Sequence, residues 1–263
     1  MSNHPVAIRC EGIGKRFLLN YTDPYHGLRA KLAGMLPGAR PNAAPVGLWA
    51  LRDVSFEIPP GGVFGVVGSN GSGKSILLRI LARVTKPTTG RAEVHGAIGS
   101  ILQLGAMLVP DLTGRENIYQ IGTLLRLSRA AIDRHFDEII DFSGIESQLD
   151  SLVRAYSAGM QLRLAFAVFA YLDSDVLLLD EALSVADEEF RIRCIERIRG
   201  MAARGKTIVV VSHEMAMMAD LCDQILVMDH GRLQAFGDAR DIVGKYLDHQ
   251  FAGTGGPRTG IQP

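Results

Sequence analysis

The stretch GSNGSGKS, residues 68–75, decides how this sequence folds. It fits the pattern G-x-x-x-x-G-K-[ST], with the apolar run VFGVVG (residues 63–68) leading into it and a helical pattern, Lys74 to Ala82, behind it. Glycines let backbone N–H groups turn inward around phosphates. A merely flexible glycine turn is the alternative, but it explains neither the lysine nor the flanking strand. The stretch therefore predicts a phosphate site between a buried strand and a helix.

Each residue of this loop has an expected role. Lys74 reaches the β and γ phosphates of a nucleotide, and the Ser75 hydroxyl can ligate Mg²⁺. The rest of the loop is expected to surround the phosphates with backbone N–H groups, from Gly68, Ser69, Asn70, Gly71, Ser72 and Gly73.

Polar side chains end two later apolar runs. VLLLDE (residues 176–181) ends in Asp180 and Glu181, and TIVVVS (residues 207–212) is followed by His213. Beside a phosphate loop, Asp180 is expected to hold Mg²⁺ and Glu181 to act as general base toward the attacking water. His213 is expected to contact the γ-phosphate. The alternatives are two acids that cap the next helix and a structural histidine.

The composition narrows the classes of protein to which this chain can belong. Of the 263 residues, 47% are hydrophobic. The 28 basic side chains balance 28 acidic ones, so nothing in the total charge indicates that the chain binds nucleic acid. Three scattered cysteines indicate a reducing compartment. The start lacks the features of a secretory signal, and the longest apolar run, LAFAVFAYL (residues 164–172), is far shorter than the about 20 residues of a membrane span. We expect a cytoplasmic chain that a partner would hold at any membrane.

The order of the patterns predicts an α/β fold with a parallel sheet, interrupted by a mostly helical block over 113–172. Two early strands, VAIRC and VSFEI, are separated by a polar insertion, 20–46, that contains one amphipathic pattern. DEEFRIRCIERIRGMAARG predicts a crossover helix that ends at Gly205, and QILVMD and RLQAFG predict two late strands. The tail from Ala252 has a disordered composition.

A second anion site is predicted where YSAGM (residues 156–160) opens an apolar helix, with Ser157 as its N-cap. With this feature the sequence resembles the ATP-binding cassette (ABC) family, whose signature usually reads LSGGQ; here Ala158 and Met160 replace Gly and Gln. In that family the signature faces the nucleotide of the other subunit. The resemblance implies that Ser157, Ala158 and Gly159 bind the ATP of a second copy in a head-to-tail homodimer.

The resemblance covers about Ile8 to Leu247. It implies an ABC-type P-loop NTPase domain over residues 1–250, with a RecA-like parallel core, N-terminal antiparallel strands and a helical subdomain at about 104–172, before a disordered tail, 251–263. ATP and Mg²⁺ are the implied cofactors, and the metal ligands are Ser75, Gln103 and Asp180.

Three further functional positions of the family have counterparts in this sequence. Gln103 in SILQLGAML (residues 100–108) occupies the catalytic Q-loop, with Leu104 as the rival equivalence. SVAD (residues 184–187) matches the D-loop. Phe17 stands at the adenine-stacking position, with Trp49 and Tyr21 as alternatives; a core aromatic is the ordinary interpretation of each.

Within the family, the closest likeness is to the subgroup that exports bacterial polysaccharides. It rests on the insertion before LWALRDVSFEI, on LGA before LTGREN, on YSAGM and on LLLDEALSVAD. The likeness implies a peripheral ATPase on the cytoplasmic face of the inner membrane. Two copies would drive two permease subunits, which would handle the polysaccharide or lipid-linked glycan, and no nucleic acid would be involved. Another cargo, such as a lipid or drug, and a soluble ABC ATPase are the alternatives.

Two expectations concern partners. SILQLGAML is expected to receive the permease through apolar side chains such as Leu104 and Met107, whose alternative place is the subdomain core. Only a short Gly- and Pro-bearing tail follows the cassette. We therefore expect the isolated chain not to bind the glycan itself.

Overall fold

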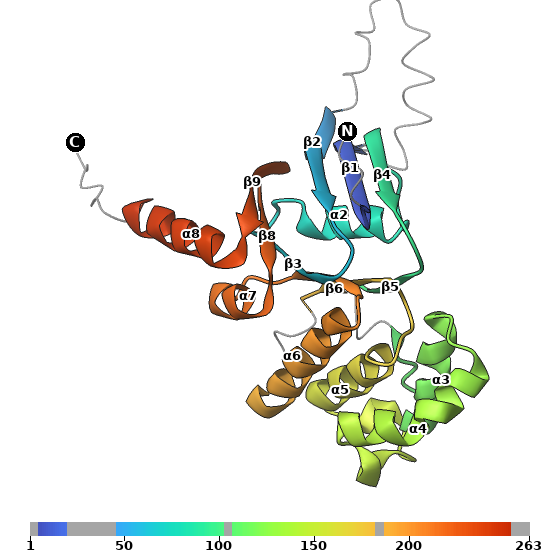
Figure 1. Ribbon diagram of the computed structural model, residues 1–263. Helices are drawn as coiled ribbons and strands as arrows, with labels where there is room; N and C mark the ends of the chain where they lie inside the picture. Colours follow the sequence, from blue (N-terminus) through green and yellow to red (C-terminus); the bar gives the residue numbers. More distant parts are fainter. Residues whose placement is uncertain (1–4, 20–45, 103–106, 182–186, 254–263) are drawn as a thin grey trace, which may run out of the picture.

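The computed structural model describes residues 5–19, 46–102, 107–181 and 187–253, and it contains two sheets that lie in separate layers (Figure 1). The smaller sheet is antiparallel, with the strand order β2-β1-β4. Its strands are β1 (Ile8–Leu19), β2 (Val46–Ile58) and β4 (Thr89–Val94). The predicted N-terminal strands are therefore present, and both extend beyond the predicted runs because β1 and β2 stay paired as far as Leu19 and Val46.

The larger sheet carries the α/β core, with the strand order β5-β6-β7-β3-β8-β9. The first five strands are mutually parallel, and β9 pairs antiparallel with β8. The strands are β3 (Gly62–Gly68), β5 (Ile98–Ile101), β6 (Val176–Asp180), β7 (Thr207–Val211), β8 (Gln224–Asp229) and β9 (Arg232–Asp238). The predicted parallel sheet is confirmed, and strand β3 lies inside it between β7 and β8.

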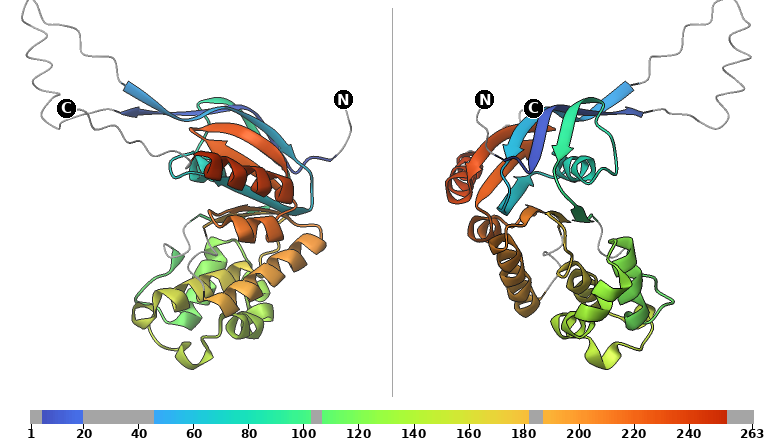
Figure 2. Two further views of the ribbon diagram at one scale, coloured as in Figure 1. Left: turned by 90° about the vertical axis from the view of Figure 1, so that its left-hand side faces the viewer. Right: turned by 45° about the vertical axis from the view of Figure 1, so that its right-hand side comes forward.

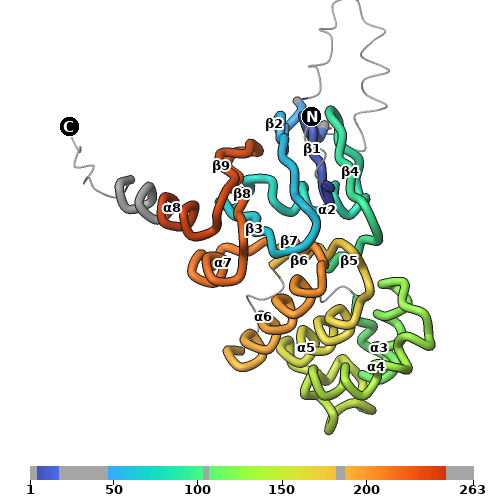
Figure 3. Tube along the Cα trace, in the orientation of Figure 1, coloured from blue at the N-terminus to red at the C-terminus, as the bar shows by residue number. Residues whose placement is uncertain are grey.

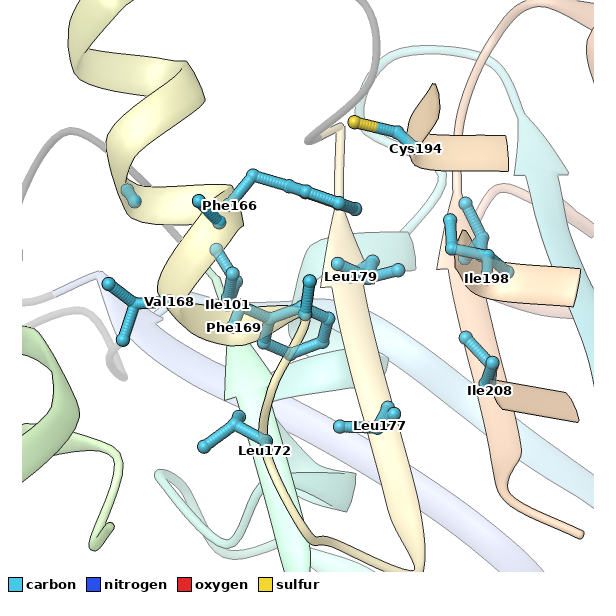
Figure 4. Packing of buried hydrophobic residues seen from close by; sticks show 14 of the residues in the cluster. Ile101, Phe166, Val168, Phe169, Leu172, Leu177, Leu179, Cys194, Ile198 and Ile208 are labelled. Carbon is cyan, nitrogen blue, oxygen red and sulfur yellow. The ribbon is translucent and has the colours of Figure 1, made fainter. Parts of the chain in front are cut away.

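The continuous apolar strands face two hydrophobic cores. In β6, Leu177 and Leu179 pack into the core on the side of the helical subdomain. Val176 and Leu178 pack into the core on the opposite side, toward the antiparallel sheet. Period-two alternation sends neighbouring side chains to opposite faces, so a strand covered on both faces is apolar throughout. Figure 4 shows the first core, where Phe166 and Phe169 of one helix approach β6.

Helices cover both faces of this sheet. Helix α2 (Lys74–Leu81) belongs to the core shared with the antiparallel sheet. Helices α6 (Glu188–Ala203), α7 (Met215–Leu221) and α8 (Ala239–Gly253) follow later in the chain. The predicted crossover helix is α6; it ends at Ala203, and Gly205 follows with φ +85°.

A helical subdomain lies at the end of the molecule opposite the antiparallel sheet, as both views of Figure 2 show. It contains α3 (Gly114–Leu124), α4 (Arg129–Ser143) and α5 (Ala158–Phe169), with the short 3-10 turns Glu146–Gln148 and Val153–Ala155. These elements fall inside the predicted helical block. Serine and threonine N-caps begin all three α-helices.

Some predictions fall outside the described residues. These are the amphipathic pattern within 20–45 and the tail from residue 254. Helix α8 continues to Gly253, so the first three residues of the tail expected over 251–263 are helical. Within the described ranges, no helix combines the length and apolar character needed to cross a membrane.

Asn117 holds the loop before α3, and its replacement by alanine is expected to destabilise the fold. Its side chain is fully buried; the amide oxygen accepts from Val109 N at 2.8 Å, and the amide nitrogen donates to carbonyls that include Val109 O at 3.1 Å and Thr113 O at 2.9 Å. Alanine leaves these groups without their partner, so we expect a loss of about 2–3 kcal/mol in the free energy of unfolding, measured by denaturant titration.

Thr123→Ala on the same helix is the matched control, because the exposed Thr123 hydroxyl only donates back to Tyr119 O at 2.8 Å. A change within about 0.5 kcal/mol is expected there. Equal losses for the two variants would contradict the role given to Asn117.

Candidate nucleotide-binding site

The loop between β3 and α2 has the backbone of an anion cradle. Gly68, Gly71 and Gly73 have φ values of 148°, 78° and 102°, which residues with side chains rarely adopt. A Cβ on Gly68 would lie 2.0 Å from Met228 O in the neighbouring strand β8. The glycines of the motif therefore allow the turn, and Gly68 also allows its close approach to the sheet. The loop leads directly into the N-terminus of α2, where the first backbone N–H groups of a helix have no partner within the helix.

Lys74 lies inside this loop. Its side chain is 6% exposed, and its Nζ donates to Gly68 O at 2.8 Å and to Ser69 O at 2.9 Å. Burial lowers the pKa of the Lys74 ammonium, while the carboxylates of Glu181 and Asp180 act in the opposite direction. A polyanion in the loop would further favour the charged ammonium, as the sequence motif predicts.

Asp180 ends β6 beside the start of α2. Its carboxylate accepts a hydrogen bond from Ser75, which lowers its pKa, but burial has the larger effect and raises the pKa. Among the residues that the structure describes, one carboxylate oxygen, Oδ1, is buried without a hydrogen-bond partner, and so is the Ser72 hydroxyl. The unpaired Asp180 oxygen and the Ser75 hydroxyl that donates to the same carboxylate are hard-oxygen ligands of the kind that suits Mg²⁺, so Asp180 and Ser75 fit the predicted metal site.

Glu181 and His213 meet across the ends of β6 and β7. His213 Nδ1 lies 3.9 Å from Glu181 Oε1, and both side chains are at least half exposed. Glu181 has φ 50°, and its backbone N–H donates to Val211 O at 3.0 Å. A left-handed residue other than glycine is costly, and here the contact with β7 helps to hold it. The carboxylate is thereby held beside the imidazole at the edge where parallel strands end.

A cavity of about 410 Å³ joins these groups to the loop. Its lining includes Ser69, Asn70, Glu181 and His213, and also Met215 and Tyr246 from helices α7 and α8. Tyr246 was missed by the sequence analysis. No local motif marks it; only the packing of α8 against α7 brings it to the cavity.

The predicted signature residues lie elsewhere on the chain. Ser157 caps α5, and its Oγ accepts a hydrogen bond from Met160 N at 3.2 Å. Ser157 and Ala158 are exposed and Gly159 is half-buried, and none of the three lines the cavity. The chain thus presents a helix N-terminus to its surroundings rather than to its own phosphate loop.

Neither Phe17 nor Trp49, the two described candidates for adenine stacking, lines this cavity. Phe17 is 40% exposed, with Lys15 Nζ 5.4 Å from the ring centre, and it pairs with Leu48 of β2. Trp49 lines a separate hollow of about 300 Å³ with Arg52. Tyr21, the third alternative, lies outside the described residues.

Several family positions are also outside the described residues. These are Gln103, its rival Leu104, and the first three residues of SVAD. Asp187, the last residue of SVAD, is described: it caps α6 by accepting from Phe190 N at 3.0 Å, and it pairs with Arg163 of α5. Met107 is half-buried and packs against the hydrophobic core that the helical subdomain shares with the parallel sheet, which favours the core alternative given for it above.

Known proteins resemble this chain along most of its length. The family model described as ABC transporter matches residues 51–184. The O-antigen export system ATP-binding protein RfbB of Klebsiella pneumoniae is 40% identical over 197 residues, which are 75% of this chain and 80% of that protein. RfbB of Myxococcus xanthus is 38% identical over 224 residues, 85% of this chain. The chain spans only 51% of that protein.

Two further matches are informative. The teichoic acids export ATP-binding protein TagH of Listeria innocua is 39% identical over 198 residues, 75% of this chain and 59% of that protein. A solved structure titled as the ATP binding subunit of an ABC transporter superposes with a TM-score of 0.72 at 20% identity, covering 94% of this chain and 98% of that one. At that identity the structural match supports the fold.

Proposed function

Because this chain belongs to the ABC transporter family, we propose that it is the ATP-hydrolysing nucleotide-binding subunit of an exporter for a polysaccharide or lipid-linked glycan. The observation that carries the ATPase activity is the meeting of the phosphate loop, Asp180, Glu181 and His213 at one edge of the sheet. The cargo is supported by the relatives named for O-antigen and teichoic acid export.

The chemistry is divided among the residues of that edge. Loop N–H groups and the Lys74 ammonium bind the β and γ phosphates, Glu181 accepts a proton from the attacking water, and His213 hydrogen-bonds the γ-phosphate. Ser75 and Asp180 hold Mg²⁺, together with Gln103. When bound, Mg²⁺ neutralises phosphate charge.

The complete site takes its remaining part from a second copy. Ser157, Ala158 and Gly159 of one chain face the γ-phosphate held by the other, so that two chains close head-to-tail on two ATP molecules. The exposed N-terminus of α5, outside its own chain's cavity, supports this arrangement. Phe17 stacks on the adenine.

The membrane steps belong to partners. Two permease subunits handle the cargo, and this chain acts as a peripheral subunit on the cytoplasmic face of the inner membrane. The family membership and the relatives' names, which refer to export systems, support this assignment. Residues 1–250 form the ATP-binding domain.

The proposal is tested by purifying the chain with the membrane protein encoded beside it and reconstituting both in liposomes. We expect a stable complex whose ATP hydrolysis rises severalfold when lipid-linked glycan from the same cells is added, because cargo binding to the permease favours closure of the two ATPase chains. Phosphate release gives the rate. The isolated chain should show no calorimetric signal with that glycan.

Other outcomes identify the rival functions. Stimulation by a lipid or drug but not by glycan would mean export of another cargo. Stimulation by RNA without any membrane partner would mean a soluble ABC ATPase. A complex that carries Glu181→Gln controls for contaminating hydrolases.

A further inference from the structure

The turn between β8 and β9 lies beside the phosphate loop. Strand β8 is the parallel neighbour of β3, with Met228 in register with Gly68, and Figure 3 shows the two strands side by side. Asp229 pairs with Arg232, so His230 and Gly231 form a two-residue hairpin turn. Both have positive φ, 44° and 77°, as in a type I′ turn.

This turn is hydrogen-bonded to two other segments through backbone atoms alone. Gly231 N donates to Ser72 O, inside the phosphate loop, at 3.1 Å. Gly231 O accepts from Arg52 N, in β2, at 2.7 Å. One residue therefore links the loop to the antiparallel sheet. The His230 side chain is 93% exposed and takes no part in this link.

The bond to Ser72 O orients a peptide group of the loop. In a trans peptide the carbonyl and the following N–H point in opposite directions. With the Ser72 carbonyl turned toward Gly231, the Gly73 N–H points away from the turn. A carbonyl that turned toward a phosphate would repel it, whereas an N–H attracts it. Holding this carbonyl therefore favours anion binding.

Close backbone contacts explain why glycine stands at both position 73 and position 231. A Cβ on Gly231 would lie 2.6 Å from Ala50 O and 3.0 Å from Ala50 C. A Cβ on Gly73 would lie 2.7 Å from the same oxygen, and its nearest atom of Gly231 is Cα at 3.6 Å. The loop, the turn and β2 thus meet with no room for a methyl group.

We propose that Gly231 is a positioning residue for nucleotide binding, which holds the Ser72–Gly73 peptide in its anion-binding orientation. The proposal rests on the function proposed above, since it takes the loop to bind the phosphates of ATP. Gly231 does not line the cavity that holds Glu181 and His213. Its effect is therefore on nucleotide affinity and not on the chemical step.

Gly231→Ala is expected to raise KM for ATP about tenfold while kcat changes less than about threefold, because the turn must move away from Ala50 and loses its bond to Ser72. Steady-state phosphate release measures both constants. Gly205→Ala is the matched control: Gly205 has φ +85°, so the backbone strain is similar, but an added Cβ meets no atom of the described residues within 4 Å. Its KM should stay at the wild-type value.

His230→Asn serves as the conservative variant, because asparagine suits the first position of this turn and keeps Gly231 in place. Its KM should also be unchanged. A wild-type KM in Gly231→Ala, or an equal rise in Gly205→Ala, would overturn the proposal. If the wild-type protein itself neither binds nor hydrolyses ATP, the proposed function fails instead.

Hydrogen exchange on the wild-type protein tests the same link without a mutation. On addition of ADP and Mg²⁺, exchange of the Gly231 amide is expected to slow severalfold, since it bonds to the loop that binds the phosphates. The Gly205 amide, which donates to Ala202 O at 2.8 Å, should not respond. An unchanged Gly231 rate would overturn the proposal even if Gly231→Ala cannot fold.

Discussion

Replacing Glu181 with glutamine is expected to lower kcat for ATP hydrolysis about 100-fold or more, while ATP binding is kept. The amide has nearly the shape of the carboxylate but cannot accept the proton of the attacking water. Phosphate release measures kcat, and calorimetry measures ATP affinity. Because hydrolysis is blocked, the variant should also accumulate as an ATP-bound dimer, visible by size-exclusion chromatography.

Glu214→Gln is the control for this prediction. Glu214 immediately follows His213, but its carboxylate accepts from Arg191 Nη1 at 3.0 Å and does not line the cavity. Its kcat should stay near that of the wild type. Near-normal hydrolysis by the Glu181→Gln protein would remove Glu181 as the general base.

The second large effect concerns the arrangement of two lesions in a dimer. Lys74→Ala removes the buried ammonium of the phosphate loop, and Ser157→Arg places a bulky cation at the exposed start of α5. If each site combines the loop of one chain with α5 of the other, a dimer with one lesion on each chain keeps one intact site. Differentially tagged chains yield this dimer in pure form, and its hydrolysis should be about half the wild-type rate if the two sites act independently.

The control dimer joins a wild-type chain to a chain that carries both lesions. It has the same number of changes, but now each composite site carries one of them, so hydrolysis and ATP-dependent dimerisation should both be lost. The reverse pattern, with activity kept only in this second dimer, would show that the site is built within one chain. Equal loss in both dimers would instead indicate that one damaged site disables the other.

Local patterns predicted much of the site. The phosphate loop was recognisable because glycine spacing, Lys74 and a flanking apolar strand are features of one continuous segment. Asp180, Glu181 and His213 could be placed because each follows an apolar run, and the carboxyl ends of parallel strands meet at one edge of a sheet. Ser157 was predicted as an N-cap from its place before an apolar helix, and its hydrogen bond to Met160 N confirms this.

The roles of the aromatic residues could not be predicted from local patterns. Phe17 and Trp49 were both plausible stacking rings, since an exposed or half-buried aromatic carries no local sign of its partner. Tyr246 was missed because its place depends on α8 packing against α7, two helices joined only through β8 and β9.

The sequence by itself therefore determined the α/β class, the phosphate loop and the acids and histidine that face it, because each depends on residues close together in the chain. Only the tertiary structure decided the strand order that puts β8 beside β3, the entry of Tyr246 into the cavity, and the contact of Gly231 with Ser72. The physical reason is that these features arise from pairing between distant segments. The contact of Gly231 is made by backbone N–H and C=O groups, which nearly all residues have, so no side-chain pattern in the sequence predicts it.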